Sequence, residues 1–180
     1  NNARGVEDIS LFEVASLFFK DAPHSMNRSI AGVRVGKLNR KTSFKDERAF
    51  DFYDVKADVY ALISHYGLDP EKLQIKLDAP SYYHPGKSCS FYLGKTLIAT
   101  CGELHPVVKK NLDISNTVVM LEIHVDRLPA MRVKNAKQKL VLSNFQKVNR
   151  DFAFLVKNET SAGEIVSLIK GADKNLIESV

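Results

Sequence analysis

The sequence predicts a protein of the α+β class, with an antiparallel β-sheet flanked by helices. Several short segments alternate apolar and polar residues, one longer segment repeats apolar residues at helical spacing, and tight turns rather than regular strand–helix–strand crossovers join the strands. With 180 residues, 44% of them hydrophobic and 26% charged, the chain suffices for one large domain, or one domain and part of another. This composition is not that of a disordered chain, and no apolar run is long enough to cross a membrane.

The first elements are strands. Residues 9–19 alternate loosely and end in a Leu-Phe-Phe run, which predicts a strand that is buried on one side and paired centrally. Residues 32–36 predict a shorter strand with a glycine at each end, and the polar, basic residues 40–48 predict a loop. The chain begins with Asn and stops without a turn signal, so we expect it to be a fragment of a longer protein.

Residues 53–66 predict the clearest helix. Asp51 or Asp54 is suited to cap its start, and Gly67 suits the left-handed position just past its end. The apolar residues fall on one stripe of this helix. They are Val55, Val59, Leu62, Ile63 and Tyr66.

The next part of the chain predicts a strand, a hairpin, a short helix and another strand. Apolar and polar side chains alternate at residues 73–79 and 119–125, which is typical of strands with one solvent-exposed face. Gly94 and Lys95 separate two apolar segments, which predicts a two-residue hairpin turn with Gly at its first position. Pro106 suits the first turn of a helix over residues 106–112.

A domain boundary is expected at residues 128–139, where the chain becomes polar and basic without periodicity. Beyond it, residues 151–157 predict a strand, and Ser161 with Glu164 has the capping-box pattern of a helix start. Residues 176–180 predict the beginning of a further strand. Such a β-α-β opening is typical of half of a ferredoxin-like domain.

Cys89 and Cys101 have no metal or redox spacing and fall on the two arms of the predicted hairpin. We interpret them as reduced, partly buried thiols, which indicates weakly that the protein is intracellular. The net charge of +5 is moderate, but residues 127–150 contain basic residues and no Asp or Glu. This segment is either a phosphate-binding surface or a solvated linker. Its basic residues are Arg127, Arg132, Lys134, Lys137, Lys139, Lys147 and Arg150.

Three polar residues around the hairpin suggest acid–base or metal chemistry. Glu103 and His105 lie near the helix start, and His84 precedes the hairpin. Their spacing matches no metal-ligand signature that we trust. A structural interpretation is simpler: Glu103 lies at the positive end of the helix, and His105 hydrogen-bonds to the loop that carries His84.

Other polar and aromatic clusters have ordinary explanations. Asp51, Asp54 and Asp58 are explained as exposed or capping acids. Tyr82 and Tyr83 are suited to stack on bases but are better explained by packing under a loop.

Four motifs, in this order, resemble a known family. They are Ile-Ser-Leu-Phe-Glu-Val at residues 9–14, Asp-Phe-Tyr-Asp-Val-Lys at 51–56, the His-Pro-Gly to Gly-Glu-Leu-His-Pro stretch at 84–106, and Phe-Gln-Lys-Val-Asn-Arg-Asp at 145–151. Together they resemble the carboxy-terminal region of the β subunit of bacterial phenylalanyl-tRNA synthetase, over nearly the whole chain.

The resemblance implies three segments. Residues 1–128 would be a class II synthetase-like core without catalytic residues, 129–140 a linker, and 141–180 the beginning of a ferredoxin-fold anticodon-binding domain. No catalytic, cofactor-binding or metal-binding residue is expected in this chain, although the complete cytoplasmic enzyme would use ATP and magnesium. The implied partners are the α subunit, in an α2β2 heterotetramer, and phenylalanine tRNA, with no membrane.

Three functions therefore remain open from the sequence. The favoured one is a non-catalytic part of phenylalanine–tRNA ligase, which scaffolds the α subunit and contacts tRNA through Lys147 and Arg150. The alternatives are a free-standing basic RNA-binding module, and a small hydrolase that uses Glu103, His105 and His84.

Overall fold

The computed structural model describes residues 5, 7–18, 26–39, 43, 47–130, 145–173 and 175–180. The chain forms two compact units, Asn1–Asn135 and Ala136–Val180. Their division falls inside the predicted linker, of which residues 131–140 lie outside the described part of the chain. Within the described residues, no helix has the length and apolar character needed to span a membrane.

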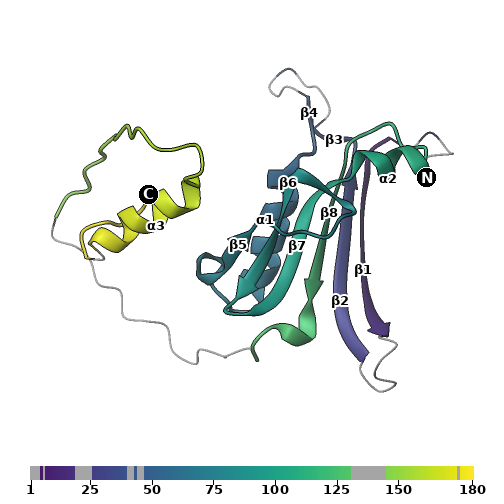
Figure 1. Cartoon of the computed structure of the whole chain (residues 1–180), viewed down its shortest axis with the longest axis horizontal. Coiled ribbons are helices and arrows are strands. Elements are labelled where there is room, and N and C mark those ends of the chain that lie inside the picture. Colours follow the sequence, from purple (N-terminus) through teal and green to yellow (C-terminus); the bar gives the residue numbers. More distant parts are fainter. Residues whose placement is uncertain are drawn as a thin grey trace. The chain divides into compact units, whose positions relative to one another are not determined.

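The first unit is built on a six-stranded sheet in which every neighbouring pair is antiparallel (Figure 1). From one edge to the other the strands are β1 (Ile9–Phe18), β2 (Met26–Val35), β8 (Val118–His124), β7 (Thr96–Leu104), β6 (Tyr83–Leu93) and β5 (Gln74–Lys76). β3 (Lys37–Asn39) and β4 (Arg48–Ala49) form a separate two-stranded sheet. The described part of this unit also contains the short 3-10 helices η2 (Pro70–Lys72) and η3 (Val125–Arg127).

The helix predicted at residues 53–66 is confirmed as α1 (Phe52–His65). Asp51 is its N-cap: the backbone N–H groups of Tyr53 and Asp54 donate to Asp51 Oδ1 at 2.8 and 3.3 Å. In return, the Asp51 N–H donates to Asp54 Oδ2 at 2.8 Å, which completes a capping box. Gly67 has the positive φ (79°) expected of the residue past the helix end.

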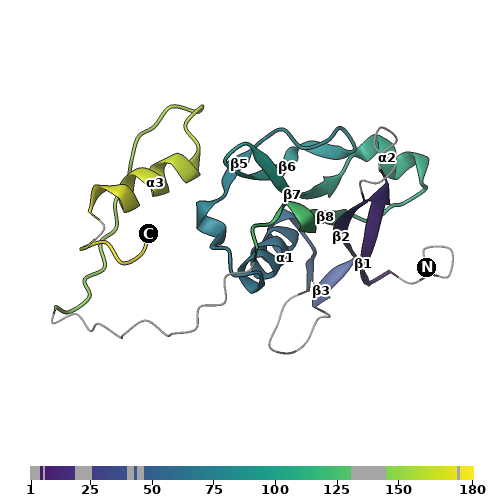
Figure 2. The same cartoon turned by 90° about the horizontal axis from the view of Figure 1, so that it is seen from below.

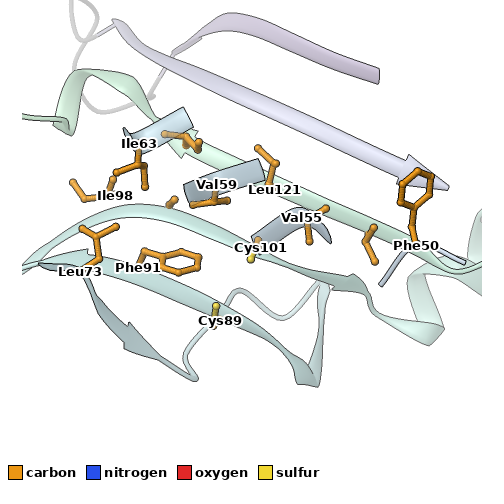
Figure 3. Packing of buried hydrophobic residues seen from close by; sticks show 13 residues of the cluster. Phe50, Val55, Val59, Ile63, Leu73, Cys89, Phe91, Ile98, Cys101 and Leu121 are labelled. Atoms are coloured by element: carbon orange, nitrogen blue, oxygen red, sulfur yellow. The ribbon is translucent and has the colours of Figure 1, made fainter. Parts of the chain in front are cut away.

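The hydrophobic core lies between α1 and the β6–β7–β8 part of the sheet (Figures 2 and 3). Val55, Val59 and Ile63, three members of the predicted apolar stripe, are fully buried on the inner side of α1. They share the core with side chains of the sheet and of the segments flanking α1. These are Phe50, Leu73, Cys89, Phe91, Ile98, Ala99, Cys101, Val119, Leu121 and Ile123.

The predicted hairpin is confirmed, with β6 and β7 joined by Gly94 and Lys95 and with Leu93 opposite Thr96. Its other end leads into α2 (Pro106–Asn111), where Pro106 occupies the first turn as expected.

Three strand predictions need correction. β1 is a strand but not a central one: it forms an edge of the sheet, and most of its side chains are exposed on both faces. β2 begins at Met26 rather than near residue 32, because pairing with β1 and β8 recruits a polar stretch that carries no apolar alternation. β5 is shorter than predicted, because it pairs with β6 over Gln74–Lys76 and the chain then leaves the sheet. Of the predicted loop at 40–48, residues 40–42 and 44–46 lie outside the described residues.

The second unit contains the predicted helix, α3 (Ala162–Ala172), with a capping box between Ser161 and Glu164. The strands predicted at residues 151–157 and 176–180 are wrong: both segments are extended or irregular but unpaired. A strand requires a neighbour to take up its backbone hydrogen bonds. Within the described residues of this unit, neither segment has such a neighbour, and none of the described side chains is buried.

The hairpin turn requires a left-handed backbone conformation at Gly94, whose φ is 61°. Gly94→Val should lower the free energy of unfolding by about 1–2 kcal/mol, since a β-branched residue resists that conformation. A Cβ at this position would meet no atom within 4 Å, so the cost is one of backbone conformation alone. Thermal unfolding followed by circular dichroism measures it. Gly94→Asn should stay close to the parent, because Asn tolerates positive φ; an unchanged melting temperature for the Val variant would contradict the assigned turn.

Candidate functional site

The face of the sheet that points away from α1 carries several polar residues. Strand alternation places on it the residues between the core positions of β6, β7, β8 and β2. Four of these polar residues are buried: Ser29, Ser88, Ser90 and Thr100. Buried hydroxyls on an antiparallel sheet would suit a ligand-binding floor, so what covers this face decides whether it can act as one.

Tyr82 and Tyr83 cover part of this polar face. The Tyr82 hydroxyl donates to both carboxylate oxygens of Glu122, at 3.0 and 3.1 Å, and the Thr100 hydroxyl donates to the Tyr83 hydroxyl oxygen at 3.5 Å. Tyr83 is 2% exposed, and its ring lies 4.9 Å from that of Tyr82. The predicted packing role of the pair is therefore confirmed for Tyr83.

The tyrosine hydroxyls are held in the neutral form. Burial, together with the negative charge of Glu122, raises the pKa of Tyr82 to about 12 and raises the pKa of Tyr83 as well. Both side chains therefore fill space and hydrogen-bond at neutral pH, and neither is poised to act as a base.

The structure gives each member of the suspected acid–base group a structural partner. Lys87 Nζ donates to the two oxygens of Glu103 at 2.9 and 3.1 Å, so Glu103 forms an ion pair rather than serving the helix start. The backbone N–H of Gly86 donates to His84 Nδ1. The expected link from His105 to the loop of His84 is made by its backbone, whose N–H donates to Tyr82 O at 2.8 Å.

His105 also caps α2, since the Val107 N–H donates to His105 Nδ1 at 3.2 Å. Among the residues that the structure describes, no three His, Cys, Asp or Glu side chains gather as metal ligands would. The local contacts therefore support the structural interpretation of Glu103, His105 and His84.

The acids of α1 are explained by ion pairs and caps. Arg48 forms ion pairs with Asp54 at 2.7 Å and with Asp51 at 3.2 Å. Arg34 makes a bidentate ion pair with Asp58, with N–O distances of 2.7 and 3.0 Å. The hydrogen bond from Arg48 lowers the pKa of Asp54 below its ordinary value of 3.8.

Cys89 and Cys101 lie directly opposite each other on β6 and β7, inside the core. Both are free thiols and both are buried, whereas the sequence predicted partial burial. The hydrogen bond with Cys89, followed by burial, raises the pKa of the Cys101 thiol. A thiol held neutral in an apolar core is chemically inert, which agrees with a packing role.

An apolar groove of about 300 Å³ lies on the other face of the sheet, between α1 and β1. We call it the α1–β1 groove, and its apolar lining includes Phe12, Ile30, Gly32, Val55, Leu62 and Leu121. The Arg34–Asp58 ion pair also borders it. The sequence does not reveal this groove, because its walls come from segments that are far apart in the chain. The loose alternation of apolar residues along β1 is a local signal for it.

The predicted tRNA-binding residues lie in the second unit. Lys147 projects with 81% of its side chain exposed and forms an ion pair with Glu178 at 2.6 Å, which raises the pKa of Lys147. Arg150 is also exposed. Of the other basic residues, Arg127 lies in η3 of the first unit and donates to Leu97 O at 3.3 Å. Arg132, Lys134, Lys137 and Lys139 lie outside the described residues.

The fold of the chain resembles part of an aminoacyl-tRNA synthetase. A pyrrolysyl tRNA synthetase from Desulfitobacterium hafniense shares it with a TM-score of 0.51, over 71% of this chain and 42% of that chain. At 11% sequence identity this likeness shows the fold alone, and it agrees with the predicted class II synthetase-like sheet.

A family model described as the phenylalanyl tRNA synthetase beta chain CLM domain matches residues 1–125, and the chain belongs to this family. Two phenylalanine–tRNA ligase beta subunits illustrate the relationship. Those of Rhodospirillum rubrum and Bartonella quintana are each 39% identical to this chain, over 182 and 187 aligned residues. Each alignment covers 100% of the chain but 23% of the relative, so the chain spans about a quarter of the relatives' length.

The contribution of Asp54 to the stability of the protein should depend on pH. Asp54→Asn should lower the free energy of unfolding at pH 7 by about 1 kcal/mol, since it weakens both the cap and the Arg48 ion pair. The folded-state pKa of Asp54 lies below its unfolded value, so its contribution is present above that value and is lost as pH falls through the folded pKa. Urea unfolding of both proteins from pH 7 down to pH 3 should therefore show their difference shrinking. Glu13→Gln, at an exposed site on β1, is the matched control; a difference that stays constant with pH would contradict the assignment.

Proposed function

We propose that this chain is a non-catalytic part of phenylalanine–tRNA ligase, which scaffolds the catalytic α subunit and contacts phenylalanine tRNA during ATP-dependent aminoacylation. The observation that carries the proposal is the family match over residues 1–125. The relatives' shared name, phenylalanine–tRNA ligase beta subunit, supplies the reaction and the tRNA. The working assembly would be an α2β2 heterotetramer in the cytoplasm.

The contacts of the first unit support a non-catalytic role. Tyr82 and Tyr83 cover part of its polar sheet face, and Glu103 is neutralised by Lys87. These residues do not fit an ATP or magnesium site, because their polar atoms are already engaged within the chain. In this proposal, ATP and magnesium bind in the complete enzyme elsewhere than at Tyr82, Tyr83 and Glu103.

The second unit would supply the tRNA contact, as the beginning of a ferredoxin-like anticodon-binding domain. Helix α3 has the predicted capping box. Apolar side chains of the second unit, such as Phe152 and Leu168, are exposed, so they are available to pack with further elements of such a domain. Lys147 and Arg150 present positive charge at its surface, which suits contact with tRNA phosphates.

Complex formation with the α subunit tests the scaffold role. The chain should co-elute with the α subunit of phenylalanine–tRNA ligase in size-exclusion chromatography with light scattering, and alone it should not charge tRNA. Charging by the isolated chain would show that it is catalytic. Separate elution, combined with RNA binding that shows no preference for phenylalanine tRNA, would instead favour a free-standing RNA-binding module, because a binder that contacts phosphates alone does not discriminate sequence.

Neutralising two basic residues tests the tRNA contact. The double variant Lys147→Gln/Arg150→Gln should bind phenylalanine tRNA more weakly and reduce the slope of log affinity against log salt by about two, since each lost phosphate contact removes about one unit. Fluorescence anisotropy with labelled tRNA measures both quantities. Glu178→Gln should tighten binding, because it releases Lys147 from its ion pair. Lys95→Gln/Lys110→Gln, in the first unit, is the charge-matched control; unchanged affinity of the first variant at low salt would refute the assignment.

A further inference from the structure

Two cysteine side chains face each other in the core of the first unit. Cys89 of β6 and Cys101 of β7 are partners in the antiparallel register, and Figure 3 shows both on the side of the sheet that carries α1. Directly opposite residues in antiparallel strands have Cα atoms about 4.5–5.5 Å apart, and a disulfide requires about 4.4–6.8 Å. The strand pairing therefore satisfies the Cα spacing of a disulfide without movement of the strands.

The two thiols differ in acidity. The hydrogen bond from Cys101, helped by the positive charge of Lys56, lowers the pKa of Cys89, whereas the pKa of Cys101 is raised. Lys56 Nζ lies 5.4 Å from the centre of the Tyr60 ring. This ring packs edge-on, at 5.9 Å, against Phe91, the next residue on the same side of β6 as Cys89. Because the thiolate is the nucleophile, Cys89 is the reactive member of the pair.

Burial determines which oxidant reaches the pair. Both cysteines are at most 1% exposed, so only a small, uncharged molecule can enter, and it does so when the fold opens locally. The β6–β7 ladder has a weak point beside them: regular pairing ends at Ser88 and Gly102, and the register shifts between Ser88 and Tyr83. A register shift interrupts the backbone hydrogen bonds, so the strands separate most readily next to Cys89.

We propose that Cys89 and Cys101 form a peroxide-reactive dithiol site, whose disulfide ties β6 to β7. The Cys89 thiolate attacks one oxygen of hydrogen peroxide and becomes a sulfenic acid; the O–O bond breaks, and the departing hydroxide takes up the proton that Cys89 had released. The Cys101 sulfur then attacks the sulfenic sulfur. The S–S bond forms, the S–O bond breaks, and the departing hydroxide takes the Cys101 proton. Two thiols are thereby oxidised, and one hydrogen peroxide is reduced to two waters.

The reduced and oxidised forms of this pair act differently. When reduced, the two thiols pack in the core as small apolar groups. When oxidised, they close a short covalent loop around the turn at Gly94, so that β6 and β7 no longer separate at the register shift. The dithiol site involves neither tRNA nor the α subunit, so its failure leaves the proposed function untouched.

Treatment of the 180-residue chain with hydrogen peroxide at pH 7 tests the dithiol site. The chain contains two cysteines, so an intramolecular disulfide joins Cys89 to Cys101. Mass spectrometry after alkylation of the remaining thiols should show loss of two hydrogen atoms and linked Cys89 and Cys101 peptides, and dithiothreitol should restore both thiols. If both thiols survive in the folded chain at a peroxide concentration that oxidises the chain in denaturant, the pair is only a packing pair.

Single variants test which thiol reacts first. In Cys101→Ala, the sulfenic acid of Cys89 should accumulate and be trapped by dimedone. In Cys89→Ala, Cys101 should react at least about tenfold more slowly. If either variant impairs folding, as circular dichroism reveals, brief dimedone trapping and peptide mapping of the unaltered chain replace it, and the label should lie on Cys89. Equal labelling of the two residues, or labelling of Cys101 first, would overturn the assigned roles.

Lys56→Met tests the contribution of the nearby charge. This variant should slow oxidation about threefold, because loss of the positive charge leaves a smaller fraction of Cys89 as thiolate. Lys95→Met, at an exposed position in the hairpin turn, is the matched control and should oxidise at the parent rate. Equal slowing in the two variants would contradict a specific effect of Lys56.

Discussion

The packing of α1 against β7 and β8 is the interaction on which the rest of the first unit depends. Val55, Val59 and Ile63 are fully buried where α1 meets β7 and β8, and this contact selects which alternate residues of each strand face inward (Figure 3). A shift of one residue in any strand would turn its core side chains to the opposite face. The burial of these three side chains therefore determines the register of the sheet as well as the position of the helix.

The two faces of the sheet acquire different roles from this alternation. Along the strands, buried hydroxyls on the face away from α1 alternate with core residues on the opposite face. Tyr82 and Tyr83 cover part of the hydroxyl-bearing face and hydrogen-bond to Glu122 and Thr100. A synthetase-like sheet is thus used here to bind its own side chains. On the helix face, one helix is too narrow for six strands, and the apolar character of β1 persists where α1 no longer reaches. The same architecture thus covers part of one face with the chain's own side chains and leaves apolar side chains of β1 exposed on the other.

Local signals account for what the sequence could predict. The start of α1 and the turn at Gly94 were predicted, because capping boxes and positive φ depend on neighbouring residues. The edge position of β1 was not, because strand order depends on pairing between distant segments, and the same apolar run suits an edge or a centre. The strands predicted at 151–157 and 176–180 failed for a related reason: apolar alternation shows that a segment can pair but not that a neighbour is present.

The predicted tRNA-binding site likewise has features that the sequence reveals and features that depend on the fold. Exposed charge at Lys147 follows from the sequence, but its ion pair with Glu178 depends on how the second unit folds back on itself. This pair lies at the surface, where attraction between charges is weak and salt screens it. A phosphate can therefore replace Glu178, and the ion pair weakens RNA binding without preventing it. In the first unit, by contrast, the Arg34–Asp58 ion pair is partly buried and tied to α1. Lys147 is therefore better suited to exchange partners, and Arg34 to maintain the fold.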